Sequence, residues 1–214
     1  MPGIRGPVLC GHDEVLETVL DLAAVVGRVR GMLFEPDATL AGHGVPAPGW
    51  RLVVREHALP VLAGTSAGAF VLAALLGPAT GPSVAFLALF MASRVIINLA
   101  GIFLMASVAR FYAGLFGSTA GFDAAFVLVA LAMTPVYVAE MLAPVVQAAL
   151  SPAATMLLIL LAFGYSFAIL YRGTGLVLGL PPEHRGAHFG LTLVTLVVLA
   201  MLAGLLLGPF LLPV

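Results

Sequence analysis

The sequence predicts an all-α integral membrane protein with five transmembrane helices preceded by an amphipathic interfacial helix. Of the 214 residues, 62% are hydrophobic and only 9% are charged, whereas a soluble domain is about a quarter charged and about half apolar. Five separate apolar runs are each long enough to cross a bilayer. A chain of this composition cannot cover itself with polar surface in water, so it belongs in a membrane.

The first part of the chain, residues 1–57, is predicted to be a cytoplasmic segment ahead of a membrane domain at 58–214. Within it, residues 13–33 place apolar side chains at three- and four-residue steps, with acids first and arginines last, as the helix dipole favours. This helix is too charged to span, so it lies on the membrane surface or against the other helices, or it binds a partner. Residues 34–50 are rich in proline and glycine and predict a loop, with at most a short helix near 37–41.

Trp50 lies beside Arg51 and close to Arg55. An amphipathic ring next to cationic side chains is typical of an anchor at the lipid headgroups, and we expect these residues to form one. The only cysteine, Cys10, excludes an internal disulfide and a cysteine-based zinc site. The first fifteen residues lack the apolar core of a signal peptide, so we expect insertion through the protein's own helices.

The membrane domain is divided into five predicted spans. Each is long enough, at about 1.5 Å per residue, to cross roughly 30 Å of hydrocarbon, and the second is so long that it tilts or projects into water. No internal repeat is visible, which argues against an inverted-repeat transporter. The spans are predicted at about 58–76, 83–109, 124–142, 152–171 and 188–212.

The arginines predict the orientation of these spans. Eight of them fall in segments on one side of the membrane and none on the other, which is the pattern of cytoplasmic loops. The N-terminus is then cytoplasmic and Val214 lies on the opposite side. The absence of lysine and the heavy use of Ala, Gly, Pro and Leu are typical of a GC-rich bacterial genome, hence of a bacterial inner membrane. The eight are Arg5, Arg28, Arg30, Arg51, Arg55, Arg110, Arg172 and Arg185.

The ninth arginine, Arg94, lies inside the second span, where a charge costs roughly 2.5–3.5 kcal/mol. Asn98 follows one helical turn later, and Glu140 is the only acid in a predicted span. These three residues form a candidate intramembrane polar site. By the predicted register Glu140 lies about two turns from Arg94, so an ion pair between them requires Arg94 to extend along the helix. Alternatively, backbone carbonyls, Asn98 or water satisfy Arg94, or it contacts an anionic lipid headgroup or a partner subunit.

Two kinds of residue predict helix geometry. Pro135 lies in the middle of the third span, where it removes a backbone hydrogen bond and kinks the helix, and the Thr134 hydroxyl can bond a freed carbonyl. We interpret the kink as a fixed shape rather than a gate. Small residues at four-residue spacing predict close helix packing within the chain, with dimerisation as the alternative. They are Gly64 and Gly68 in the first span and Gly204 and Gly208 in the fifth.

No pattern of residues in the sequence indicates a catalytic, cofactor or metal site. His184 and His188 have a spacing that suits a metal, but Pro181, Pro182 and Gly186 argue against a continuous helix there, and no third buried ligand is evident. The serines in the spans lack a histidine and an aspartate at matching depth. With no lysine there is no phosphate-binding loop, and a net charge of −1 leaves no basic surface for nucleic acid. We therefore expect no enzymatic activity and no cofactor.

Several short motifs, in a fixed order, resemble the Yip-one domain family, the Yip/YIPF (Ypt/Rab-interacting) membrane proteins, and its bacterial branch. The resemblance covers about residues 30–210 and implies five spans with the N-terminus inside. Arg94 departs from the family's second helix, and Ser118 stands where the family has a second glycine. The matching motifs are LFEPDATL at 33–40, LFG at 115–117, GFDAA at 121–125, TPVY at 134–137, YSFAILYRG at 165–173 and LGLPPEH at 178–184.

The resemblance implies little chemistry. Eukaryotic relatives are linked to Rab-type GTPases and vesicle traffic, which bacteria lack, and the bacterial members have no established activity. We therefore expect a non-enzymatic accessory or interaction component of the membrane, one that binds lipid, belongs to a larger membrane complex or pairs with a second copy. The alternative is a small transporter or channel subunit with a polar path at Arg94, Asn98 and Glu140.

Overall fold

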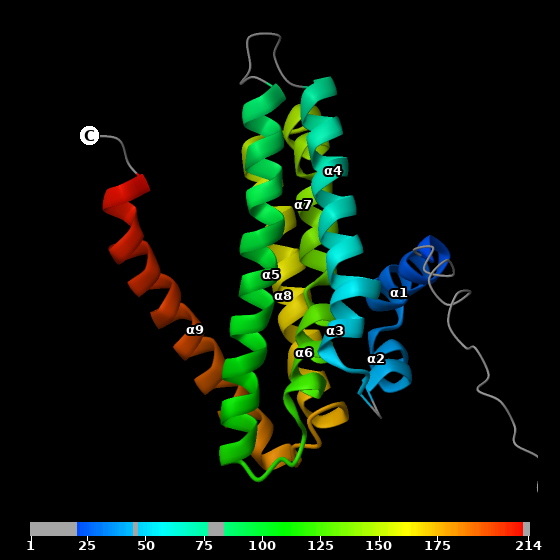
Figure 1. Cartoon of the computed structure of the whole chain (residues 1–214), viewed down its shortest axis with the longest axis vertical. Helices are drawn as coiled ribbons and strands as arrows, with labels where there is room; N and C mark the ends of the chain where they lie inside the picture. Colours follow the sequence, from blue (N-terminus) through cyan, green and yellow to red (C-terminus); the bar gives the residue numbers. More distant parts are fainter. Residues whose placement is uncertain (1–20, 45–46, 77–83, 212–214) are drawn as a thin grey trace, which may run out of the picture.

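The computed structural model describes residues 21–44, 47–76 and 84–211, and these residues form helices and turns with no strand among them (Figure 1). Four helical segments precede the long helices of the bundle. The elements are α1 (Leu22–Phe34), α2 (Pro36–Gly44), α3 (Trp50–Val53), the π-helical segment η1 (Val54–Ala58), α4 (Leu59–Leu76), α5 (Val84–Leu115), α6 (Phe122–Ala132), α7 (Thr134–Ala149), α8 (Pro152–Leu176) and α9 (Pro182–Leu211).

Five helices in the described part are long and apolar enough to cross a membrane, as the sequence predicted. They run from Trp50 to Leu76, Ala88 to Leu115, Phe122 to Ala149, Pro152 to Leu176 and Pro182 to Ala203. Most extend beyond the predicted runs, because a helix continues past the apolar core wherever its backbone bonds and neighbours permit. The prediction of non-helical chain around Pro182 is wrong, because Pro182 is the first residue of α9, a position that needs no N–H.

The segment before the first span is mostly helical where it is described, and residues 47–49 lie outside its helices. Asp21 caps α1 by accepting a hydrogen bond of 3.0 Å from the Ala24 N–H. Val25 and Met32 are buried, whereas Leu22 is 63% exposed, so the amphipathic interfacial helix stays a prediction, and its residues 13–20 lie outside the described part. The short helix expected near 37–41 is α2.

The third span lies at the centre of the bundle. Its two halves pack against α4, α5 and α8, and α6 also contacts α2 and α3. In its most apolar 18-residue window 78% of the residues are buried, against 6 to 22% in the other four spans. Every residue of α6 from Ala124 to Ala132 is buried, and four of those nine are alanine. Small side chains let neighbouring helices approach on all sides.

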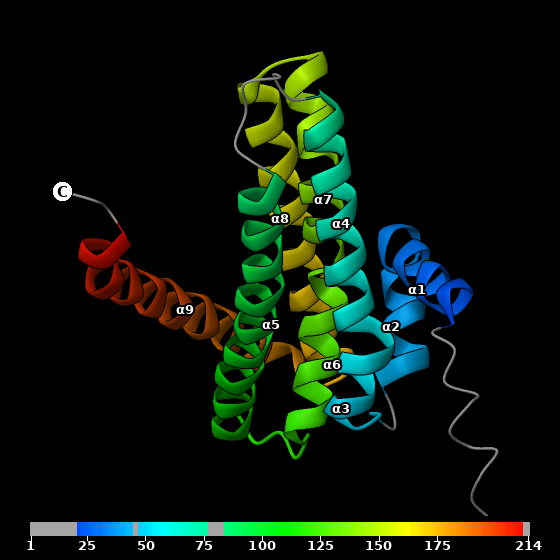
Figure 2. The same cartoon turned by 45° about the horizontal axis from the view of Figure 1, so that its top comes forward.

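The fifth span leaves the bundle. Figures 1 and 2 show α9 starting beside the ends of α5 and α8 and diverging from them toward its C-terminal end. Among its packed residues are His188, which bonds α5, Phe189, whose ring lies edge-on to Phe167 of α8, and Thr195, which bonds Tyr112. Beyond them large apolar side chains are exposed, among them Val197, Val198, Met201, Leu202 and Leu205.

Two turns meet at one end of the bundle. Helix α5 ends in a Schellman motif: Gly117 has a φ of 82°, which favours glycine, and the Ser118 N–H bonds the Ala113 carbonyl at 3.0 Å. The Ser118 hydroxyl donates to the Leu178 carbonyl at 2.5 Å in the turn between α8 and α9. Ser118, where the resemblance expected a glycine, therefore joins the two turns.

Candidate functional site

An ion pair links α5 to α7 within the membrane-spanning part of the bundle. The Arg94 guanidinium donates a hydrogen bond to the Glu140 carboxylate, and both side chains are about a quarter exposed. Each charge thereby neutralises the other, which lowers the cost of holding an ion in hydrocarbon. Of the alternatives that the sequence left open, the structure contains the pair with Glu140.

Asn98 lies one turn from Arg94 on α5 and is partly exposed. In the described part of the chain its side chain makes no hydrogen bond to Arg94 or Glu140. The structure thus brings together two of the three predicted polar residues. That any of the three has a function beyond packing stays a prediction.

The third span is interrupted at Met133, between α6 and α7. Pro135 has no N–H to give to the Leu131 carbonyl four residues earlier, so the regular backbone ladder stops there. The Thr134 hydroxyl does not bond a freed carbonyl of the helix; it contacts His57 Nε2 at 3.1 Å. His57 is only 2% exposed, and its Nδ1 is buried without a partner.

The partner of His57 could not be found from the sequence, because the two residues are 77 positions apart. The structure, unlike the sequence, marks this residue locally. His57 stands in a π-helical segment just before Pro60, and such segments are frequent at functional sites. His57 is therefore a candidate residue that the sequence analysis missed.

A cavity of about 60 Å³ adjoins His57, between the N-terminal helices and α6, and both apolar and charged side chains line it. Pro60 gives no N–H to the Glu56 carbonyl, and Arg28 of α1 donates a hydrogen bond to that oxygen. The Arg28 Nε is buried without a partner. The lining residues are Arg28, His43, Pro48, Leu52, Val53, Glu56, His57, Val127 and Leu131.

Comparison with models of known protein families assigns the chain to one family. The Yip1 domain model matches residues 30–205, which is most of the sequence. The chain belongs to the Yip1 domain family. No curated protein and no solved structure matches it significantly. Yip1 family members are membrane proteins that are not known as enzymes and that interact with other proteins.

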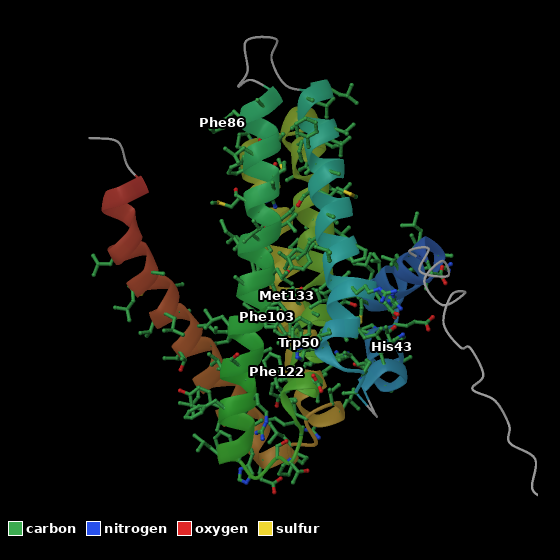
Figure 3. The ribbon with its side chains drawn as sticks, in the orientation of Figure 1. His43, Trp50, Phe86, Phe103, Phe122 and Met133 are labelled. Atoms are coloured by element: carbon green, nitrogen blue, oxygen red, sulfur yellow. The ribbon has the colours of Figure 1, made fainter. Side chains whose placement is uncertain are left out.

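In this Yip1 family protein Trp50 packs inward, into an aromatic cluster (Figure 3). Its ring lies edge-on to Phe103, with centroids 5.2 Å apart, and its backbone N–H bonds Asp123 Oδ1 at 2.9 Å. Arg51 lies over the Trp50 ring at 5.3 Å, and Arg51 and Arg55 are exposed. Trp50 thus joins the first span to α5 and α6, and the role of the three residues as a headgroup anchor stays a prediction.

The two pairs of glycines differ in what surrounds them. A Cβ on Gly68 would lie 2.8 Å from the Met141 sulfur of α7, so this glycine permits close packing between α4 and α7, whereas Gly64 has nothing within 4 Å. Gly204 and Gly208 lie in α9, but their surroundings are outside the described part. Their packing role stays a prediction.

His184 and His188 lie on the first turns of α9 and do not face a common ligand. The His188 ring donates Nε2–H to the Ala109 carbonyl at 2.9 Å and is 2% exposed, whereas His184 is exposed and stacks on Phe116. No group of three or more metal-ligating side chains is found among the described residues. His188 thus fastens α9 to α5.

Proposed function

We propose that this Yip1 family protein is a non-enzymatic accessory component of the membrane that binds another membrane protein through α9. The observation that carries the proposal is the divergence of α9 from the bundle (Figures 1 and 2). Helices in lipid associate through packing and polar contacts, and a helix that diverges from its own bundle leaves its sides available to a second protein.

The exposed part of α9 supports this interpretation. Its large side chains beyond Leu196 include Met201 at 71% and Leu205 at 74% exposure, and Gly204 and Gly208 have the spacing of a close helix contact. Interaction with other proteins is also the common property of the family.

The Arg94–Glu140 pair does not favour a transport path. Each ion is neutralised by the other, so neither requires a transported ion or substrate as its partner. We propose that the pair fixes α5 against α7.

We further propose that the end of the bundle with the two joined turns faces the cytoplasm of a bacterial cell, which places the N-terminus inside and the C-terminus outside. Arg110, Arg172 and Arg185 lie close to those turns. The bond from Trp50 to Asp123 brings Arg51 and Arg55 to the same end. Such a concentration of arginine is typical of the cytoplasmic side.

The test is purification of the tagged protein from native membranes in mild detergent, comparing Met201→Trp with Leu160→Trp. Met201 and Leu160 are 71% and 62% exposed, on α9 and α8 respectively, so the second variant controls for added bulk on a lipid-facing helix. A partner bound through α9 is retained by the wild type and by Leu160→Trp and is lost from Met201→Trp. Recovery of the protein alone, together with ion flux in liposomes, would overturn the proposal.

A further inference from the structure

We infer that the cavity beside His57 binds a phosphate-type oxyanion. This inference is independent of the proposed partner on α9, because the cavity lies between α1, α2, the start of the first span and α6. Two buried nitrogen atoms at this site have no hydrogen-bond partner, Arg28 Nε and His57 Nδ1. Buried polar atoms without a hydrogen-bond partner are uncommon, so a bound ligand is the simplest source of the missing partner.

The chemistry of Arg28 selects the ligand. A guanidinium carries only donors and is always charged, so the atom it faces must be an acceptor, and a negative one is preferred. Arg28 is held in place by its bond to the Glu56 carbonyl. The planar fork of an arginine fixed in this way matches two oxygens of a phosphate group.

Of the two histidines beside the cavity, His57 adds a second donor. His57 is 2% exposed, and its Nε2 is occupied by Thr134, so Nδ1 is the ring atom left for the cavity. With an anion at Nδ1–H, Nε2 accepts the proton of the Thr134 hydroxyl. His43, on α2 (Figure 3), donates Nδ1–H to the Thr39 carbonyl at 2.9 Å, so the Nε2 of its neutral ring carries no proton and donates no hydrogen bond to the anion.

Glu56 is the one acid that lines the cavity. Its side chain is exposed, and in the described part of the chain Arg28 contacts its carbonyl oxygen and makes no ion pair with its carboxylate. Among the described residues, the positive charge of Arg28 is therefore not neutralised by an ion pair. A cavity of about 60 Å³ also exceeds the space that a single water needs, roughly 10–15 Å³.

A phosphate group could come from a lipid headgroup or from the aqueous phase, and the experiment separates the two. The full-length protein is titrated with sodium phosphate against sodium chloride at equal ionic strength in a neutral detergent. In parallel it is placed in phosphatidylcholine nanodiscs with and without phosphatidylglycerol. The readout is the thermal midpoint of unfolding, from which an apparent affinity follows by linkage.

The matched variants are Arg28→Gln and Arg30→Gln, which remove the same charge two residues apart on α1; Arg30 is exposed and lies outside this cavity. We expect an apparent affinity at least about tenfold weaker for Arg28→Gln, as loss of a charged hydrogen bond predicts. Arg30→Gln should match the wild type. A response to phosphate alone identifies a soluble ligand, and a response confined to phosphatidylglycerol identifies a lipid headgroup.

If Arg28→Gln does not fold, a second measurement tests the inference on the wild type. Histidine-selective ¹⁵N labelling of the wild type, with His57→Gln to assign the resonance, should show a shift of His57 Nδ1 when the anion is added. The inference is overturned if neither anion changes the midpoint or the Nδ1 resonance. It is equally overturned if Arg28→Gln and Arg30→Gln respond alike.

Discussion

The third and fifth spans are both apolar enough to cross a membrane, yet their surroundings are opposite. In the window of highest hydropathy 78% of the third span is buried, against 11% of the fifth. The third is broken at Met133 and alanine-rich in its first half, whereas α9 is one continuous helix from Pro182 to Leu211. Hydropathy thus decides which segments enter the bilayer, while side-chain size and polar contacts decide which of them lies at the centre.

Adding bulk to each span should give the largest difference between them. Ala132 in α6 is completely buried and Ala203 in α9 is exposed. We expect Ala132→Phe to cost at least about 3 kcal/mol, the upper end of typical overpacking, and to lower the yield of folded protein. Ala203→Phe should unfold like the wild type when both are followed by circular dichroism during titration with SDS. Equal losses in the two variants would refute the central position of the third span.

Removing one charge of the ion pair should have the next largest effect. Glu140→Leu leaves Arg94 unpaired in the membrane region, which we expect to cost about 3 kcal/mol. The double variant Arg94→Leu/Glu140→Leu should recover most of that loss, because apolar replacements of buried pairs are well tolerated. The free energy of unfolding in SDS, compared through the double-mutant cycle, measures the coupling. Additive losses would mean that the two side chains do not stabilise each other.

A substitution at the break in the third span should have a smaller effect on stability. Thr134→Val removes the side-chain hydrogen bond of the buried His57 ring, at an expected cost of about 1–3 kcal/mol. The double variant His57→Leu/Thr134→Val removes the polar groups together and should be more stable than Thr134→Val alone. The same SDS titration measures both variants. If the double variant is the less stable of the two, the hydrogen bond is not what makes Thr134→Val costly.

The smallest effect is expected where the fifth span is attached. Tyr112→Phe removes one hydrogen bond, of 2.7 Å, to Thr195, and a single neutral bond contributes about 1 kcal/mol. Thermal unfolding followed by circular dichroism should show a slight decrease, with Tyr165→Phe as a control, because Tyr165 bonds Leu33 instead. A loss as large as that of Glu140→Leu would show that α9 is held more firmly than its few contacts indicate.

The sequence predicted those features of the structure that depend on a single helix. The five spans were found from apolar runs alone, since each helix satisfies its own backbone bonds. It also indicated that Pro135 disrupts the third span, because the missing N–H is a local property. The family resemblance was confirmed by the match over residues 30–205.

Contacts between distant residues could not be predicted in the same way. Whether Arg94 reaches Glu140 depends on the tilt and register of two helices, which the order of residues does not contain. The inward packing of Trp50 depends on Phe103 and Asp123, more than fifty residues away. His57 was overlooked because a lone histidine in a polar-to-apolar transition carries no pattern of its own.

The central place of α6 also affects the order in which the protein can be completed during synthesis. Its neighbours come from both earlier and later parts of the chain: α2, α3 and α5 precede it, and α8 follows it. A nascent chain that ends before Pro152 therefore leaves one side of α6 facing lipid or the translocation machinery. The Ser118–Leu178 bond likewise forms only after the fourth span has been made. The middle of the sequence is therefore enclosed only after the fourth span has been made.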